Sequence, residues 1–172
     1  MLQYVVMKAA KLCPQAIMLP VGGHREPMEI HHLIPHRDEG GFLRSGRDLV
    51  LDGTAVLSFS TQRVPPAVDG LLAHLGMNKD EIDYFVFHQA NKMINETIRK
   101  KLRLPEEKVP STLHDFGNTS GASLPVTMTA RMRDALGQGK KRVLLCGFGI
   151  GLSWGTAIVD IESGVFPALL EA

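Results

Sequence analysis

The sequence predicts an α/β fold in which a mixed, mostly parallel sheet carries helices on both faces. From residue 49 onward, strand and helix patterns alternate in the order βαβαβαββ. Such alternation is typical of parallel sheets built from strand–helix–strand units. The last two strands are joined by a connection too short for a crossover helix, so we expect them to be antiparallel. The 172 residues have the length of a single domain.

The strands are predicted from short runs of apolar, β-branched and aromatic side chains. Residues 84–87 (Tyr-Phe-Val-Phe) and 143–146 (Val-Leu-Leu-Cys) have the composition of buried strands. Weaker patterns predict short strands at residues 49–51 and 109–113. Residues 154–161 alternate in polarity, which favours a strand at a sheet edge or beside an antiparallel neighbour.

The helices are predicted from apolar side chains that recur every three or four positions. Residues 54–75 follow this pattern, and Pro65 and Pro66 are expected to kink or split the helix. Residues 92–102 have one apolar face and one basic face. Residues 120–136 form a third predicted helix, which is apolar on more than one side. A helix of that kind is usually central in a fold.

Three segments follow from the distribution of proline and glycine. Residues 1–48 contain so many of these residues that we predict a loop-rich segment, with a short amphipathic helical turn within residues 2–12. Residues 49–162 form the predicted α/β domain, and residues 163–172 a tail. A loop-rich segment of this length cannot form its own core and must lie against something else.

Composition excludes several classes of protein. Nineteen Lys and Arg residues against 18 Asp and Glu give a net charge of +1, which does not favour nucleic acid or an anionic membrane as a partner. The chain has no apolar run of about 20 residues and no signal-peptide pattern at its start. Cys13 and Cys146 are its two cysteines, too few for a disulfide framework, so we expect a reducing, cytoplasmic setting.

Three polar or glycine-rich clusters lie where predicted strands end. Residues 88–91 (His-Gln-Ala-Asn) follow one buried strand, residues 117–121 (Gly-Asn-Thr-Ser-Gly) precede a helix, and residues 147–151 (Gly-Phe-Gly-Ile-Gly) follow the other buried strand. Each lies about one strand–helix unit after the previous one, and such units bring their strand ends to the same sheet edge. We therefore expect an imidazole, a carboxamide and a glycine turn in one crevice.

Each cluster taken singly also has a structural explanation. His88 could be an ordinary loop histidine, and Asn118 could cap the helix that follows it. The glycines could serve only a tight and crowded connection. Their joint placement at one predicted sheet edge favours the functional interpretation.

The three clusters resemble the β-ketoacyl-acyl-carrier-protein synthase III family of the thiolase superfamily. The matching motifs are His88-Gln89-Ala90-Asn91, Gly117 to Ser123, and Gly147 to Gly151 with Trp154-Gly155 after it. The resemblance runs from about residue 17 to residue 161 and implies a fold of two similar halves. In this family the first half carries a nucleophilic cysteine and the second carries a histidine and an asparagine. The chain resembles the second half only.

The resemblance implies a decarboxylative condensation of acyl-coenzyme A with malonyl-acyl carrier protein, as in fatty acid biosynthesis, without a metal or another cofactor. His88 and Asn118 would be the catalytic pair, donating hydrogen bonds to the thioester oxygen that becomes negative when carbon dioxide leaves. A backbone N–H in the turn of Gly149, Ile150 and Gly151 would bind the oxyanion of the acyl group.

The resemblance also implies partners. Asn91 matches a family residue that touches the pantetheine arm of the substrate. Lys92, Arg99, Lys100 and Lys101 match a basic region that docks the acidic acyl carrier protein. The alternative is that these four side chains form an ordinary solvated helix face.

The sequence lacks a convincing nucleophile. Cys13 precedes the region of resemblance and has no strand-turn-helix elbow around it, and Cys146 lies within an apolar strand. We therefore expect the chain alone to be inactive without a first half. The apolar faces of the helix at residues 120–136 would be buried between the two halves, so without the first half we expect a homodimer.

Other functions stay open at this point. The glycine turn has the spacing G-x-G-x-G and precedes a strand, whereas a dinucleotide-binding turn needs G-x-G-x-x-G and a helix. His31, His32 and His36, with His24, could form a metal site in the loop-rich segment. A non-catalytic carrier-binding or partner-binding module, and a condensing enzyme of secondary metabolism, are the remaining alternatives.

Overall fold

The computed structural model describes residues 2–9, 15–162 and 164–168. Its main sheet has the strand order β1 (Leu2–Ala9), β8 (Ser153–Ile161), β7 (Lys141–Gly149), β6 (Tyr84–Phe87). The β6 and β7 strands are parallel, whereas the β7–β8 and β8–β1 pairs are antiparallel. The sheet is mixed, as expected, and the final two strands are antiparallel. The prediction of a mostly parallel sheet is wrong.

Two predicted elements differ from those observed. Residues 2–9 form strand β1 instead of a helical turn, and they pair antiparallel with residues 153–159 of β8. The β-branched and aromatic residues in this segment favour a strand. Residues 109–113 form no strand: Val109 ends the 3₁₀ turn η3 (Glu106–Lys108), and Leu113 begins the short helix α3 (Leu113–Phe116). Pro110 between them has no N–H to donate to a neighbouring strand.

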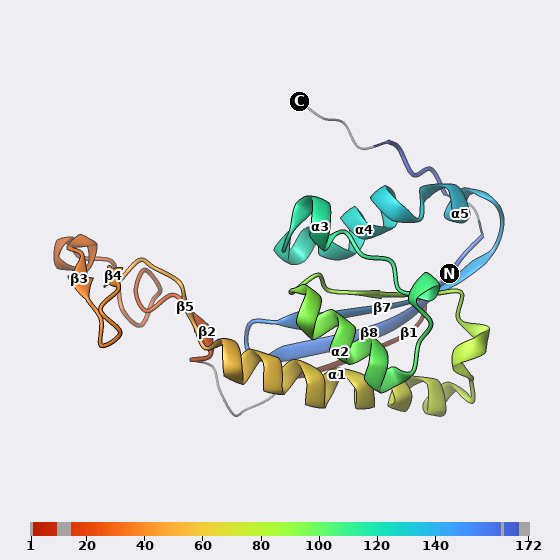
Figure 1. The fold of residues 1–172 in the computed structure, drawn as a ribbon, viewed down its shortest axis with the longest axis horizontal. Coiled ribbons are helices and arrows are strands. Elements are labelled where there is room, and N and C mark those ends of the chain that lie inside the picture. The colour runs from red at the N-terminus through yellow and green to blue at the C-terminus, as the bar shows by residue number, and fades with distance from the viewer. Residues whose placement is uncertain (1, 10–14, 163, 169–172) are drawn as a thin grey trace.

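Helices cover both faces of the main sheet (Figure 1). Helices α1 (Gly53–Leu75) and α2 (Lys92–Leu102) lie on one face, and α4 (Ser123–Arg131) with α5 (Arg133–Gly137) on the other. Between α1 and β6 lies the 3₁₀ turn η2 (Lys79–Glu81). The predicted helices at residues 54–75 and 92–102 are confirmed. None of the helices in the described part of the chain is long and apolar enough to cross a membrane.

Helix α1 continues through its two prolines instead of splitting. Pro65 has no N–H, so the carbonyl of Thr61, one turn earlier, loses its helical partner. The ammonium group of Lys101 on α2 donates a hydrogen bond to this carbonyl at 2.9 Å. Val64 and Val68, on either side of the prolines, are completely buried. A side chain from the neighbouring helix and core packing therefore compensate for the missing backbone bond.

The helix predicted at residues 120–136 is broken into three pieces. It begins as the 3₁₀ turn η4 (Ser120–Ala122), continues as α4, and restarts as α5 after Met132. Met132 leaves the helical conformation with φ −120° and ψ 0°, and its side chain is buried. The break turns α5 so that Leu136 also reaches the sheet, where it packs in the same cluster as Met132.

The core consists of two clusters, one on each face of the sheet. The larger one joins α1 and α2 to the sheet, and its fully buried members include Val64, Val68, Phe85, Phe87, Ile98, Leu102, Leu144, Cys146 and Ile158. The smaller one, beneath α4 and α5, contains Val86, Met132, Leu136 and Val143. Neighbouring residues of β6 alternate between the clusters, as expected for a strand that is covered on both faces.

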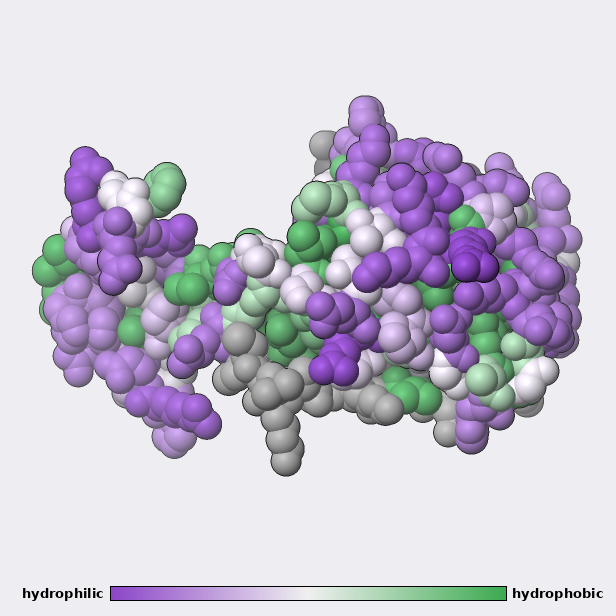
Figure 2. Space-filling model, turned by 60° about the horizontal axis from the view of Figure 1, so that its bottom comes forward, coloured by the Kyte–Doolittle hydropathy of each residue, from purple (hydrophilic) through white to green (hydrophobic). Residues whose placement is uncertain are grey.

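The segment between residues 15 and 52 forms an arm that extends away from the core (Figure 1). It contains two small antiparallel pairs and a 3₁₀ turn: β2 (Ile17–Met18) with β5 (Val50–Leu51), β3 (His36–Arg37) with β4 (Leu43–Arg44), and η1 (Ile30–Leu33). The predicted strand at 49–51 therefore lies in the arm. Figure 2 shows hydrophobic side chains among hydrophilic ones on the surface of this arm. The exposed apolar residues of the arm include Leu19, Ile30, Ile34, Phe42, Leu43 and Leu51.

Candidate active site

His88 is held against the end of strand β7. Its backbone N–H donates to the carbonyl of Cys146 at 2.8 Å, which continues the β6–β7 pairing by one residue. Its half-buried ring lies edge-on to Phe148, with ring centroids 5.3 Å apart and an interplanar angle of 89°. The parallel pairing of these two strands therefore places the imidazole beside the glycine-rich end of β7, as the cluster positions predict.

The environment of His88 favours the neutral imidazole. Burial lowers the pKa of His88, and a hydrogen bond to the backbone of Ser120 opposes this effect without cancelling it. A neutral imidazole has one ring N–H that can donate and one nitrogen that can accept. The bond to Ser120 raises the pKa, so the ring N–H is the donor in it. The neutral ring can therefore donate to a substrate oxygen only when that oxygen replaces the Ser120 carbonyl as the acceptor.

We predict that His88 titrates below the ordinary histidine pKa of about 6.5. Between the lowered pKa and about 6.5, the unfolded chain binds more protons than the folded chain, so stability falls as the pH drops through this interval. Following the imidazole resonances by NMR against pH measures the pKa directly. Urea unfolding of the His88→Gln variant should lose this part of the pH dependence. A midpoint for His88 at or above the ordinary value would contradict the prediction.

Asn118 is oriented by the backbone of Ser120. Its Oδ1 accepts a hydrogen bond from the Ser120 N–H at 2.9 Å, so its Nδ2 is the group that remains to donate to a ligand. Ser120 has φ +51°, a left-handed conformation that is uncommon for a residue with a side chain. The buried Ser123 holds this turn by donating to the Ser120 carbonyl at 2.8 Å. Ser120 thus contacts both Asn118 and His88.

The turn between β7 and β8 is the third part of the site. Gly149 pairs with Ser153, and the hydroxyl of Ser153 donates to the carbonyl of Ile150 at 2.7 Å. Gly151 has φ +121°, and a Cβ there would lie 3.3 Å from the backbone nitrogen of Ser153. Glycine is therefore required at this position. The side chain of Ile150 is exposed, with 68% of its surface accessible.

Gln89 has a role in the site that its sequence context does not indicate. Its side chain is 1% exposed, and its Oε1 accepts hydrogen bonds from the Ser111 hydroxyl and the Thr112 N–H, both at 3.0 Å. Its Nε2 donates to the carbonyl of Phe87 at 2.9 Å. Gln89 therefore ties the end of β6 to the loop that leads to Asn118. A glutamine is usually exposed, so its position in the sequence gives no signal of this role.

Comparison with known proteins places this geometry in a family. Residues 72–161 match the C-terminal domain family of 3-oxoacyl-[acyl-carrier-protein] synthase III. The chain belongs to the synthase III family. The resemblance to the C-terminal half of these proteins is thereby confirmed.

Individual relatives cover the same part of the protein. The β-ketoacyl-[acyl-carrier-protein] synthase III of Streptococcus gordonii is 39% identical over 115 residues, which are 66% of this chain and 36% of that protein. The crystal structure of a 3-oxoacyl-(acyl-carrier protein) synthase from Burkholderia xenovorans superimposes with a TM-score of 0.84 at 30% identity, over 96% of this chain and 46% of that one. The chain thus spans between a third and a half of the length of these relatives.

The helix α2 of this synthase III domain begins directly after the His88 cluster. Asn91 is its N-cap residue, and its Oδ1 accepts a hydrogen bond from the N–H of Ile94 at 2.8 Å. Lys92 and Lys100 are exposed on the outer face of the helix. Asn91 therefore has a structural role, and its Nδ2 is the group that could meet a pantetheine arm.

Two members of the predicted basic patch are engaged within the domain. The guanidinium of Arg99 forms an ion pair with Glu96 at 2.8 Å and donates to the carbonyl of Leu104 at 2.9 Å. Lys101 donates to the Thr61 carbonyl left by Pro65. Of the four predicted basic residues, Lys92 and Lys100 are therefore the two whose charge is not engaged in this way.

We predict that Lys101→Met destabilises the domain by about 1–2 kcal/mol, because it leaves the Thr61 carbonyl without a partner. The neighbouring substitution Lys100→Met is the matched control and should change stability by less than about 0.5 kcal/mol. Urea unfolding followed by circular dichroism measures both. Equal effects of the two substitutions would show that Lys101 does not support the proline-containing helix.

The remaining candidates for chemistry lie elsewhere. Burial raises the pKa of the Cys146 thiol to about 12, so it is protonated and inert at neutral pH. Cys13 lies outside the described residues. In the arm, His31 lies 3.3 Å from Glu29 and His32 lies 3.6 Å from Glu26. Across residues 2–9, 15–162 and 164–168, no three His, Cys, Asp or Glu side chains are grouped as metal ligands.

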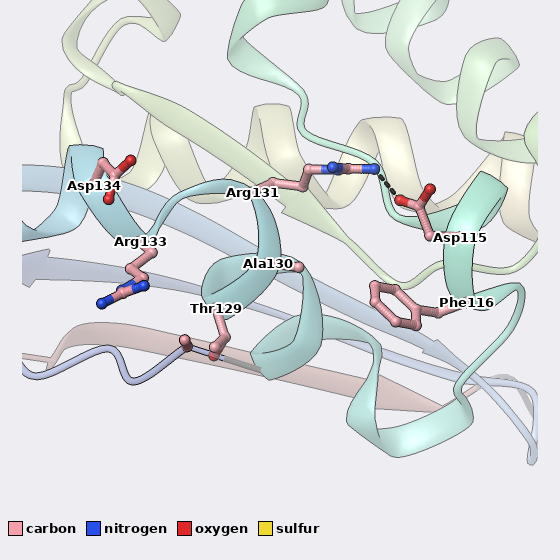
Figure 3. Close-up of a pocket in the computed structure, with 8 residues that line it drawn as sticks. Asp115, Phe116, Thr129, Ala130, Arg131, Arg133 and Asp134 are labelled. Carbon is pink, nitrogen blue, oxygen red and sulfur yellow. Dashed lines mark hydrogen bonds and ion pairs between the residues drawn. The ribbon is translucent and has the colours of Figure 1, made fainter. Parts of the chain in front are cut away.

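The hollow drawn in Figure 3 is separate from the candidate active site. It lies between α3, α4 and α5 and is lined by residues including Phe116, Thr129 and Ala130. An ion pair between Asp115 and Arg131 closes one side of it. None of the predicted site residues contributes to its walls. The hollow therefore does not include His88, Asn118 or the turn at Gly149 to Gly151.

Proposed function

We propose that this chain is the C-terminal catalytic part of an acyltransferase that condenses an acyl group from acyl-coenzyme A with malonyl-acyl carrier protein. The observation that carries the proposal is the turn at Ser120, which contacts both His88 and Asn118. It joins a neutral imidazole to an amide whose Nδ2 is left to donate. Two neutral donors suit an oxygen that becomes negative only during the reaction.

In the proposed reaction, the malonyl carboxylate leaves as carbon dioxide, and the electron pair of the broken C–C bond forms an enolate. His88 and Asn118 donate hydrogen bonds to the enolate oxygen. A neutral His88 does not hold the malonyl carboxylate in an ion pair, so the substrate charge is not stabilised before carbon dioxide leaves. The enolate carbon then attacks the carbonyl of the enzyme-bound acyl thioester, and the C–S bond of that thioester breaks to release the thiolate.

The acyl group needs a nucleophile that Cys146 cannot supply, because this thiol is buried within the core. We therefore infer that a cysteine in a first half of the enzyme carries the acyl group, and that the chain without that half is inactive. The N–H of Ile150, in the turn between Gly149 and Gly151, would hold the second oxyanion. The exposed side chain of Ile150 would shape the acyl pocket.

The carrier protein would dock on the outer face of α2. Lys92 and Lys100 supply most of the positive charge. Arg99 and Lys101 lie on the same helix and add to it, although both are bound within the domain. Asn91 meets the pantetheine arm. The natural setting of such a synthase is cytoplasmic fatty acid biosynthesis. The first half would cover the outer surface of α4, next to which Phe116 of α3 is 44% exposed. Without that half, a second copy of the chain would take its place in a two-fold dimer.

A chimaeric enzyme tests the proposed function. Residues 17–161 of this chain would replace the corresponding C-terminal part of the Streptococcus gordonii synthase III. The N-terminal part of that relative is kept and supplies the first half. We expect carbon dioxide release from malonyl-acyl carrier protein that depends on acyl-coenzyme A, with formation of the 3-oxoacyl product. The unaltered relative is the positive control. A folded chimaera that becomes acylated but forms no condensation product would favour a non-catalytic binding module.

A further inference from the structure

Asn95 is a polar residue on the inward face of helix α2. Its neighbours on that face, Ile94 and Ile98, are 3% and 0% exposed and belong to the main core. Asn95 itself is 8% exposed. An apolar side chain at this position would fit the inward face of the helix as well as the amide does.

The amide of Asn95 contacts the backbone of the proposed catalytic histidine. Its Nδ2 donates to the carbonyl of His88 at 3.1 Å, and the N–H of Ala90 donates to the same oxygen at 3.1 Å. On its other side, the N–H of His88 donates to Cys146 on β7. The peptide groups on both sides of the imidazole are therefore fixed, one to the sheet and one to α2.

This contact has an unfavourable side. The Oδ1 of Asn95 is buried and has no hydrogen-bond partner within the described part of the chain. A buried acceptor without a partner destabilises the folded state, whereas leucine has a similar size and no polar atoms. Asn95 lowers the stability of the core and at the same time forms a hydrogen bond to a residue of the candidate site. Such a combination is typical of positions that are kept for function at the expense of stability.

We propose that Asn95 is a positioning residue that fixes His88 to helix α2. The inference rests on the proposed function, since it assigns the reacting imidazole to His88 and carrier docking to the outer face of α2. The same helix carries Lys92 and Lys100 outward and Asn95 inward, so it connects the docking surface to the histidine through one hydrogen bond. Displacement of α2 by a docked carrier protein would therefore be transmitted to the imidazole.

Amide hydrogen exchange of the full chain, measured by NMR, tests the proposal in the variant Asn95→Leu. We expect the N–H of His88 to exchange about fivefold faster, the factor that corresponds to one hydrogen bond of about 1 kcal/mol. The ring protons of His88 should shift as well, since the His88 and Phe148 rings form a T-shaped pair with centroids 5.3 Å apart. The melting temperature should stay equal or rise, because the unpartnered acceptor is gone.

Thr97→Val is the matched control, because it removes a side-chain hydrogen bond to Met93 on the exposed side of the same helix. It should leave the exchange and the ring resonances of His88 unchanged. Asn95→Ala provides a second variant that deletes the donor without adding volume, and it should show the same changes at His88.

Three results would overturn the proposal: unchanged His88 signals in both Asn95 variants, equal changes in the control, or loss of the fold in either Asn95 variant. The last would show that the amide serves core packing. None of these measurements depends on enzymatic activity. An inactive chimaera with altered His88 signals in the Asn95 variants would reject the proposed function and keep the positioning role, and an active chimaera with unaltered signals would do the reverse.

Discussion

In the chimaeric synthase, His88→Ala and Asn118→Ala should each lower kcat for decarboxylative condensation about 10²- to 10³-fold. Loss of one donor to a developing oxyanion has an effect of this size. The double variant should be only slightly slower than either single variant, because two donors that hold the same oxygen act as a unit. Release of carbon dioxide from malonyl-acyl carrier protein measures the step on which both side chains act.

Acyl transfer from acyl-coenzyme A to the enzyme should persist in both variants, because that step does not need the donors. His114→Ala is a matched control, since the side chain of this histidine is 98% exposed and lies in the short helix α3 before Asn118. It should leave condensation unchanged. Parallel losses of acylation and condensation in the His88 variant would contradict a role confined to the enolate.

Asp160→Ala should lower the free energy of unfolding by about 3 kcal/mol, because it leaves the guanidinium of Arg142 without its buried partner. The Asp160 side chain is 5% exposed, and its two oxygens lie 2.7 Å and 3.2 Å from nitrogens of Arg142 on the neighbouring strand. Glu162→Ala is the control at an exposed ion pair and should change stability by less than about 1 kcal/mol. Urea unfolding at pH 7 measures both.

The Asp160 pair also predicts a dependence on pH. The hydrogen bonds from Arg142 lower the pKa of Asp160 in the folded chain. Its contribution to stability is therefore complete above the ordinary aspartate pKa of about 3.9 and is lost as the pH falls through the lowered value. The difference in stability between the parent chain and Asp160→Ala should shrink in that acid range. A constant difference down to the lowest pH would contradict the coupling.

Elements with a strong local pattern were predictable, and elements set by distant contacts were not. The strand Tyr84–Phe87 and the helix Lys92–Leu102 have the expected bounds, because their own side chains decide both their structure and their burial. Strand β1 exists only because β8 offers it a pairing edge from the far end of the chain. The helix predicted at residues 120–136 breaks where Met132 and Leu136 turn toward the sheet, and no local signal marks that break.

The candidate site also combines features that the local sequence predicts with features that depend on distant contacts. The positions of His88 and the glycine turn follow from two adjacent parallel strands, which the order of the elements implies. Lys101 binds the carbonyl that Pro65 leaves without a partner on helix α1. This contact can be predicted only when the packing of α1 against α2 is known. Gln89 and Asn95 act from buried positions through side-chain hydrogen bonds, and the sequence does not show which groups these amides contact.

The pairing of β1 with β8 has a consequence for how the domain folds. Leu2 lies opposite Val159, so the edge strand closes a loop that contains nearly the whole chain. The β7–β8 hairpin, in contrast, needs only the turn around Ile150. Loop closure over a long segment has the greater entropic cost and slows folding. The hairpin and its helices can therefore assemble first, and β1 can join the sheet only after the ribosome has released residues 153–161.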